Sequence, residues 1–197
     1  MTLPLPSRSA SSRRVAIFAS GAGSNAQKII DHFRNDTVAT VALVVSNNPG
    51  AGVLHIAAKE NIPFTVIERK HFYETGYLEL LREHQIELIV LAGFLWKVPG
   101  MLIEAYHNKI INIHPALLPK FGGKNMYGQF VHEAVINSGE KESGITIHYV
   151  DEIYDHGKII FQTTCSVEDD ETPQSLAEKI HLLEHTHYPQ VIEKLVS

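Results

Sequence analysis

Two polar side chains, Asn112 and His114, stand two residues apart at the end of an apolar run, 109–113. On a strand, side chains at this spacing point to the same face. An amide donates hydrogen bonds and an imidazole exchanges protons near neutral pH, so the pair could stabilise and protonate an oxyanion on an attacked carbonyl. Pro115 and Pro119 end the strand, at the place where open α/β sheets carry their chemistry. Two satisfied polar side chains are the alternative, and an isolated Asn-x-His pattern favours it.

A carboxylate close to His114 would favour the catalytic interpretation. The segment 151–157 carries three acids, Asp151, Glu152 and Asp155, between two later apolar runs. One of them could hold the tautomer of His114 and raise its pKa. A solvated acidic loop is the alternative, and spacing alone does not choose among the three acids.

A glycine-rich segment, 20–25, lies between the first apolar run and a helical pattern. Its glycines and the N-terminus of the following helix would offer N–H groups to an anion. Asn25 and Ala26 stand where a dinucleotide fingerprint has its third glycine, and the strand expected at 40–46 ends without an acid. We therefore expect a single bound phosphate and no nicotinamide or flavin. The alternative is a tight turn in which Ser24 caps the helix.

The chain contains 12 histidines, which raises the question of a metal site. His181 and His185 are four residues apart and would share a helix face. No strong metal-binding motif such as His-Glu-x-x-His is present. We expect a solvated or partly packed helix face and no metal.

Apolar runs typical of strands alternate with helical periodicity up to Gly128, which predicts a parallel sheet with right-handed connections. Strands are expected at 13–19, 40–46, 64–67, 88–92 and 110–113, and helices at 53–59, at 73–84 and over the segment that carries Ala26, Ile29, Ile30 and Phe33. Beyond Gly128 we expect a helix at 130–137, two antiparallel strands at 144–150 and 158–165, and a helix at 173–195. The predicted fold is therefore α/β and Rossmann-like: a doubly wound, mostly parallel sheet with antiparallel strands near the C-terminal end and a long C-terminal helix.

Size and composition indicate one domain at 13–197 behind a disordered tail at 1–12. The net charge of −5 argues against nucleic acid as the main partner. No apolar run approaches the roughly 18–20 residues of a membrane span, so no membrane partner is expected. A single cysteine, Cys165, excludes an intrachain disulfide and favours a reducing compartment. We expect a cytoplasmic protein that is a monomer or a homodimer.

Four motifs occur in a fixed order along the chain: Ser-Gly-x-Gly-Ser-Asn at 20–25, Leu-Ala-Gly-Phe at 91–94, Asn-x-His-Pro-x-Leu-Leu-Pro at 112–119, and Asp-x-Gly at 155–157. In this order they resemble the folate-dependent formyltransferases, and among these the enzymes that formylate glycinamide ribonucleotide. The resemblance runs from about Arg14 to the C-terminus.

The resemblance implies an enzyme that moves the formyl group of its co-substrate 10-formyltetrahydrofolate to the amine of glycinamide ribonucleotide, in purine biosynthesis. By the same resemblance, Asn112 would bind the formyl oxygen, and His114 would stabilise the oxyanion and serve in proton transfer. Asp155 would pair with His114 and help to move the proton from the amine. The resemblance thus selects Asp155 among the three acids.

The resemblance also implies the residues that bind the two substrates. Gly23, Ser24 and Asn25 would hold the phosphate, helped by a basic residue for which Lys70 is preferred over Arg69. Glu184 would contact glycinamide ribonucleotide. The folate would lie between two segments, represented by Leu95, Trp96, Lys97 and Val98 and by Val150 and Asp151.

Some residues depart from the usual pattern of the family, notably Trp96 and Lys97 at the folate site and His156 before Gly157. Other members of the superfamily are rivals. A methionyl-tRNA formyltransferase should carry a further C-terminal domain and a basic surface, and a formyltetrahydrofolate hydrolase an N-terminal regulatory domain. An enzyme that formylates an amino-sugar nucleotide is harder to separate by sequence. A non-catalytic phosphate-binding α/β module would use the glycine loop and leave Asn112, His114 and Asp155 unconstrained, so side chains far apart in the structure would favour it.

Overall fold

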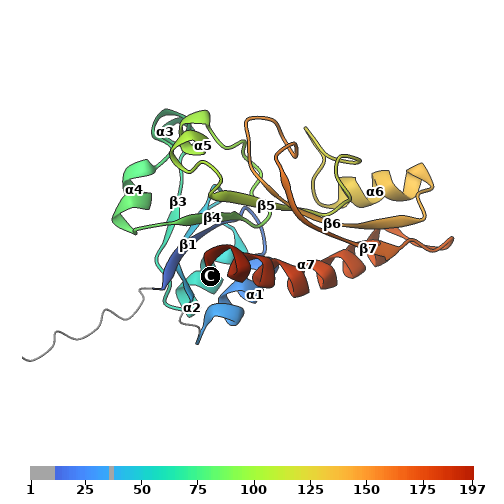
Figure 1. Ribbon diagram of the computed structural model, residues 1–197, viewed down its shortest axis with the longest axis horizontal. Helices are drawn as coiled ribbons and strands as arrows, with labels where there is room; N and C mark the ends of the chain where they lie inside the picture. Colours follow the sequence, from blue (N-terminus) through green and yellow to red (C-terminus); the bar gives the residue numbers. More distant parts are fainter. Residues whose placement is uncertain (1–11, 36–37) are drawn as a thin grey trace, which may run out of the picture.

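A computed structural model describes residues 12–35 and 38–197, which form one seven-stranded sheet with helices on both faces (Figure 1). The strands are β1 Arg13–Phe18, β2 Ala39–Ser46, β3 Phe64–Val66, β4 Leu88–Leu91, β5 Ile110–His114, β6 Glu142–Tyr149 and β7 Ile159–Ser166. The helices are α1 Ser24–Phe33, α2 Gly52–Lys59, α3 Arg69–Thr75, α4 Leu78–Glu83, α5 Gly100–Ala105, α6 Gln129–Ser138 and α7 Pro173–Val196.

The strand order is β3-β2-β1-β4-β5-β6-β7. The strands from β3 to β5 pair in parallel, whereas β6 pairs antiparallel with both β5 and β7. The order reverses between β1 and β4, and this switch point is where open α/β sheets bind ligands. The predicted fold class is confirmed.

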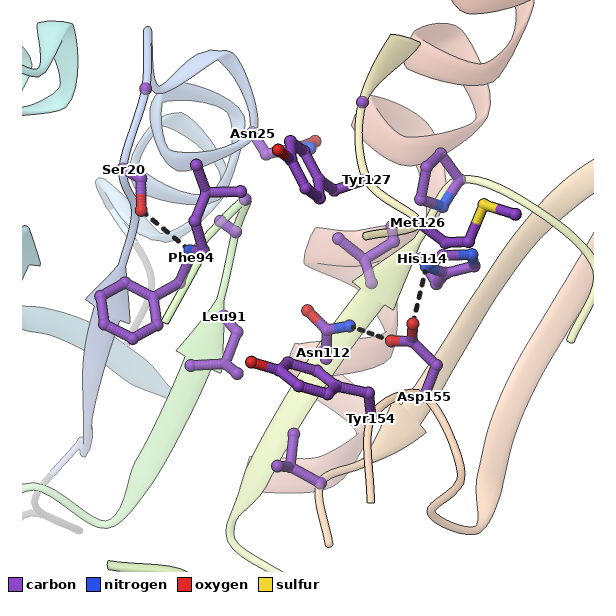
Figure 2. A pocket seen from close by; sticks show the side chains of 18 of the residues that line it. Ser20, Asn25, Leu91, Phe94, Asn112, His114, Met126, Tyr127, Tyr154 and Asp155 are labelled. Atoms are coloured by element: carbon purple, nitrogen blue, oxygen red, sulfur yellow. Dashed lines mark hydrogen bonds and ion pairs between the residues drawn. The ribbon is translucent and has the colours of Figure 1, made fainter. Parts of the chain in front are cut away.

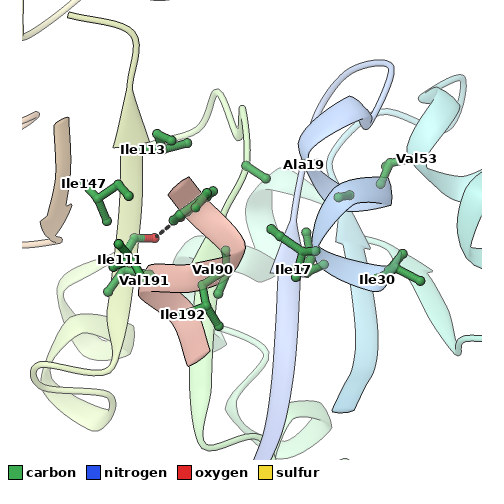
Figure 3. Packing of buried hydrophobic residues seen from close by; sticks show 14 of the residues in the cluster. Ile17, Ala19, Ile30, Val53, Val90, Ile111, Ile113, Ile147, Val191 and Ile192 are labelled. Carbon is green, nitrogen blue, oxygen red and sulfur yellow. Dashed lines mark hydrogen bonds between the residues drawn. The ribbon is translucent and has the colours of Figure 1, made fainter. Parts of the chain in front are cut away.

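Alternating side chains of the strands feed two separate cores, as the two-residue period of a strand requires. Val15 and Ile17 of β1 belong to the core that packs against α1, α2, α6 and α7, and Figure 3 shows Ile17 in this layer with Val191 and Ile192 of α7. Ala16 and Phe18 belong to the core on the opposite face, under α3, α4 and α5. The strands are therefore covered on both faces, and their polar ends are left for the site.

The helix expected at 73–84 is wrong in its extent, because two short helices, α3 and α4, occupy this region. Gly76 and Tyr77 between them both adopt left-handed backbone conformations, with φ of 59° and 52°. The Tyr77 N–H donates to the Thr75 hydroxyl, and its own hydroxyl accepts from the Glu68 N–H. The apolar residues keep helical spacing across this break, so the periodicity of the sequence predicts one continuous helix.

The tail predicted at 1–12 falls outside the described residues, apart from Ser12. Among the helices that the structure describes, none combines the length and apolar character of a membrane span. Within residues 12–35 and 38–197, no three His, Cys, Asp or Glu side chains are grouped to hold a metal ion, and the metal-free site remains a prediction.

Candidate active site

A cavity of about 630 Å³ opens at the carboxyl ends of β1, β4 and β5 (Figure 2). The segment after β1, the segment after β4 and the end of β5 form one wall, and the loop after β6 closes it from the other side. All the predicted site residues except Lys70 line this cavity: Gly23, Ser24, Asn25, Leu95, Trp96, Lys97, Val98, Asn112, His114, Val150, Asp151, Asp155 and Glu184. Segments that are far apart in the sequence thus meet at one cavity.

Asn112 and His114 point from β5 toward the same carboxylate (Figure 2). His114 Nδ1 lies 3.6 Å from Asp155 Oδ2, and Asn112 Nδ2 lies 3.5 Å from Asp155 Oδ1. His114 Nε2 is 2.8 Å from the Phe121 carbonyl oxygen, which can only accept, so Nε2 carries the proton. The neutral ring therefore presents the unprotonated Nδ1 toward Asp155.

Asp155 is held in place by its own backbone and by a neighbouring loop. Its φ of 53° is left-handed, and its Oδ2 accepts the Gly123 N–H at 2.9 Å. Burial raises its pKa and is the largest single effect, but the contacts with His148 and His114 and the hydrogen bond from the Gly123 N–H together outweigh it. The pKa of Asp155 is thus lowered, and the group is an ionised carboxylate near neutral pH.

The pKa of His114 moves in the direction opposite to the one expected from a carboxylate neighbour. Burial lowers this pKa and prevails over Asp155 and the Phe121 carbonyl, which raise it. A neighbouring acid alone would raise the pKa, but the ring is only 3% exposed, and its burial has the larger effect. His114 is therefore neutral at physiological pH and is able to accept a proton.

His148 is a buried site residue that the sequence argument missed. It lies on β6 directly opposite Asn112, and its Nε2 is 3.1 Å from Asn112 Nδ2. Its Nδ1 lies 2.8 Å from the Tyr149 carbonyl and must donate to it, so Nε2 accepts from the amide. One amide proton is thereby fixed, and the other meets Asp155 only at 3.5 Å. That second proton, which has only this long contact, is available to a substrate oxygen. Its place in the site depends on the register of β5 against β6, which pairs His148 with Asn112.

The turn after His114 is held by two polar side chains from β6 and β7. The Thr146 hydroxyl donates to the Ala116 carbonyl at 2.7 Å and accepts the Leu118 N–H at 3.0 Å. Gln162 Nε2 donates to the Leu118 carbonyl at 3.0 Å. These bonds satisfy a buried turn that two prolines exclude from sheet pairing, and they fix the chain that leaves β5.

The glycine loop meets the N-terminus of α1 without a side-chain cap. Gly23 is the N-cap residue, with φ of 86°, and a Cβ there would lie 2.8 Å from Val53 Cβ. Glycine is therefore needed both for the backbone conformation and for the close approach to α2. Ser24 is the first residue of the helix and does not cap it, so that alternative is wrong. The N–H groups of the first turn keep their capacity for an anion.

Asn25 and Glu184 join the glycine loop to α7. Asn25 Nδ2 donates to Glu184 Oε2 at 2.8 Å, while Asn25 Oδ1 is buried without a hydrogen-bond partner among the described residues. Burial raises the pKa of Glu184, although Asn25 and His181 oppose the shift. The Asn25 oxygen has no partner, and the Glu184 carboxyl group beside it has a raised pKa. Both groups can accept hydrogen bonds, so they suit a ligand that carries hydrogen-bond donors.

Glu184→Gln is expected to make the free protein more stable than the wild type at neutral pH. The folded protein binds the Glu184 proton more tightly than the unfolded chain, so wild-type stability falls as pH rises from about 4.5 toward the folded-state pKa. Each pKa unit corresponds to about 1.4 kcal/mol. Thermal unfolding of both proteins between about pH 4 and 8 should show a difference that grows with pH. A difference that is constant or shrinks would contradict the raised pKa.

Lys70 lies outside the cavity lining. Its side chain is 86% exposed, and its Nζ is 3.9 Å from Glu74. The neighbouring Arg69 turns toward the cavity wall, with its guanidinium 5.8 Å from the centre of the Trp96 ring and 6.0 Å from that of Tyr73. Arg69 thus approaches one lining residue, Trp96, whereas the Lys70 ammonium lies near Glu74, which is not part of the lining.

The wall expected to hold the folate is built from two loops that face each other. On one side Trp96 packs near Phe94, with ring centres 6.4 Å apart. Across the cavity the ring of Tyr154 lies 6.0 Å from the Lys97 ammonium. Asp151 accepts the Ile153 N–H and pairs with His156, both at 2.8 Å, which orders the second loop. Apolar faces with exposed backbone between them suit a flat heterocycle.

Two further histidines line the cavity, and no motif in the chain predicted that they would lie there. His132 of α6 is 3% exposed, and burial, followed by the nearby His181 and His114, lowers its pKa to about 4. His181 of α7 stacks on His185, with ring centres 6.1 Å apart. Both lie on the side of the cavity that carries Glu184.

The comparisons with known proteins agree with this geometry. Residues 13–192 match the model of the formyl transferase family. The phosphoribosylglycinamide formyltransferase of Bacillus subtilis is 40% identical over 190 residues, which cover 93% of this chain and 95% of the relative. The chloroplastic enzyme of the same name from Arabidopsis thaliana is 37% identical, over 91% of this chain and 64% of its own length.

The crystal structure of glycinamide ribonucleotide transformylase 1 from Geobacillus kaustophilus superposes with a TM-score of 0.86 at 40% identity, over 94% of this chain and all of that one. The chain belongs to the formyl transferase family, among the phosphoribosylglycinamide formyltransferases.

Proposed function

We propose that this protein transfers the formyl group of 10-formyltetrahydrofolate to the amine of glycinamide ribonucleotide in de novo purine biosynthesis, through a tetrahedral intermediate. The observation that carries the proposal is the meeting of Asn112, His114 and Asp155 in one cavity, whose rim holds the uncapped N-terminus of α1. The cavity thus offers an oxyanion donor, a proton acceptor and an anion site to two substrates at once.

The reaction would begin when the substrate amine attacks the formyl carbon. The amide proton of Asn112 that His148 leaves free would bind the developing oxyanion. The neutral Nδ1 of His114 would accept a proton as the amine becomes positively charged, and the Asp155 carboxylate, 3.6 Å away, would stabilise the resulting imidazolium. The proton would then pass to the folate nitrogen as the carbon–nitrogen bond to the folate breaks. The products are formylated glycinamide ribonucleotide and tetrahydrofolate, which together account for the transferred formyl group and proton.

The two substrates would bind at opposite ends of the cavity. Gly23, Ser24 and Asn25 would hold the phosphate, and Glu184 would accept hydrogen bonds from glycinamide ribonucleotide. Leu95, Trp96, Lys97 and Val98 would face Val150 and Asp151 across the pterin. For the additional cation at the phosphate, Lys70 would have to leave Glu74 and turn inward, and Arg69 on Trp96 is the alternative.

Asn25→Asp is expected to raise the KM for glycinamide ribonucleotide by about tenfold or more, and the KM for the folate far less. The new carboxylate would stand beside Glu184, which lies 2.8 Å from the present amide, and would repel a substrate phosphate. Steady-state kinetics with each substrate varied in turn measures the two constants. Asn61→Asp, at an exposed position outside the cavity lining, is the matched control. Equal increases in both KM values would contradict the phosphate assignment.

The acceptor is tested by comparing kcat/KM for glycinamide ribonucleotide and for an amino-sugar nucleotide, with 10-formyltetrahydrofolate as the donor. We expect turnover with glycinamide ribonucleotide and a much lower kcat/KM with the sugar nucleotide. The reverse order would identify the protein as a sugar-nucleotide formyltransferase. Binding of glycinamide ribonucleotide without any turnover would instead favour a non-catalytic phosphate-binding module.

The remaining features of the proposal follow the sequence. We propose a single domain at 13–197, a cytoplasmic location, and a monomer or homodimer that acts on small molecules, with no nucleic-acid or membrane partner. The net charge of −5 supports the absence of a polyanionic partner. Sedimentation equilibrium at micromolar protein would determine the oligomeric state.

A further inference from the structure

Ser20 connects the glycine loop with the loop that follows β4. Its N–H donates to the Gly93 carbonyl at 3.0 Å, and its hydroxyl oxygen accepts the Leu95 N–H at 2.9 Å (Figure 2). Its carbonyl accepts from Asn48 Nδ2 at 3.3 Å. The side chain is 7% exposed and lies at the cavity wall. Ser20 thus uses its backbone and its side chain to join two loops that are separated by more than seventy residues of chain.

Asn47 fixes the direction of the Ser20 hydroxyl. The single hydroxyl proton of Ser20 goes to Asn47 Oδ1 at 2.5 Å, so a lone pair is left for the Leu95 N–H. Asn47 follows β2 and is absent from the cavity lining. An alanine at either position would remove the hydrogen bond between Ser20 and Asn47. Alanine at position 20 would also leave the Leu95 N–H without its acceptor.

The two loops that meet at Ser20 carry the two substrates in the proposed function. Ser20 begins the segment 20–25 for the phosphate, and Leu95 begins the segment 95–98 for the folate. We propose that Ser20, oriented by Asn47, is a positioning residue that holds the folate loop in register with the phosphate loop, so that binding of one substrate favours binding of the other. This inference rests on the proposed function, because it assigns one substrate to each loop.

The test compares Ser20→Ala and Asn47→Ala with Ser46→Ala. Ser46 is fully buried at the end of β2, and its hydroxyl bonds to the backbone of Asn48, in the turn that also carries Asn47. Ser46→Ala therefore perturbs the same turn without touching the Leu95 N–H. In Ser20→Ala and Asn47→Ala we expect the KM for 10-formyltetrahydrofolate and the KM for glycinamide ribonucleotide, each measured with the other substrate saturating, to rise by similar factors on the order of tenfold, because coupling between two sites is reciprocal. In Ser46→Ala we expect neither change.

A binding measurement tests the coupling between the two substrates without relying on turnover. Titration calorimetry of tetrahydrofolate, with and without saturating glycinamide ribonucleotide, should show tighter folate binding in the presence of the nucleotide for the wild type and Ser46→Ala. This coupling should be lost in Ser20→Ala and in Asn47→Ala. If Ser20→Ala fails to fold, Asn47→Ala alone decides the question.

Two results would overturn the inference. One is a loss of affinity in Ser46→Ala as large as that in Ser20→Ala, which would indicate general damage to the turn. The other is wild-type coupling in Asn47→Ala. Failure of the proposed function is a different result, because the wild type would then show no turnover whichever way the coupling measurement came out.

Discussion

His114→Ala should lower kcat by about 10²–10⁴-fold while the protein remains folded. The neutral ring presents an unprotonated Nδ1 3.6 Å from an ionised carboxylate. Alanine removes the acceptor and the imidazolium that Asp155 would stabilise. Steady-state kinetics at saturating concentrations of both substrates measures the loss.

The control for this variant is His84→Ala. His84 also places a ring nitrogen 3.0 Å from a backbone carbonyl, that of Leu80, but it lies outside the cavity lining. Circular dichroism and thermal unfolding of both variants separate a loss of fold from a loss of chemistry. A kcat for His114→Ala within about threefold of the His84→Ala value would remove His114 from the mechanism.

Asp155→Asn should lower kcat by about 10²-fold or more and should also change the pH profile. The wild type needs a neutral His114 and an ionised Asp155, so its activity should rise with pH through the region below pH 6.5 and level off near neutrality. Asp155 raises the pKa of His114, and its charge is lost in the variant. The acid limb of the residual activity should therefore move to lower pH.

The matched control is Asp169→Asn, the same chemical change at an exposed acid that pairs with Lys141. It should leave both kcat and the acid limb unchanged. Movement of the acid limb of Asp155→Asn to higher pH, or undiminished kcat, would contradict the assignment of Asp155 as the partner of His114.

The fold was predictable because strands and helices alternate with clear apolar periodicity. The helix with Ala26, Ile29, Ile30 and Phe33 on one face is α1, and these four side chains are its buried ones. The error at 73–84 arose because Gly76 and Tyr77 reverse the backbone without interrupting the apolar spacing. A tyrosine with positive φ is uncommon, and tertiary contacts rather than propensity place it there.

The placement of the site was predictable where residue types were distinctive. Asn112 and His114 had to share a face of a strand, and the motif at 155–157 selected one acid. His148 could not be predicted, because the register of β6 against β5 does not follow from residue types alone. The neutral state of His114 was missed for a related reason, since its pKa depends on how deeply the folded chain buries the ring. Lys70 was chosen by its position in the sequence, and its side chain leaves the cavity.

The most direct test of the central claim follows a labelled formyl carbon. The purified protein is mixed with 10-formyltetrahydrofolate labelled in the formyl group and with glycinamide ribonucleotide, and both products are separated and quantified. We expect the label to appear in formylated glycinamide ribonucleotide, one for one with the tetrahydrofolate released. Release of tetrahydrofolate with the label in formate, or no turnover by protein shown to be folded, would contradict formyl transfer at the site of Asn112, His114 and Asp155.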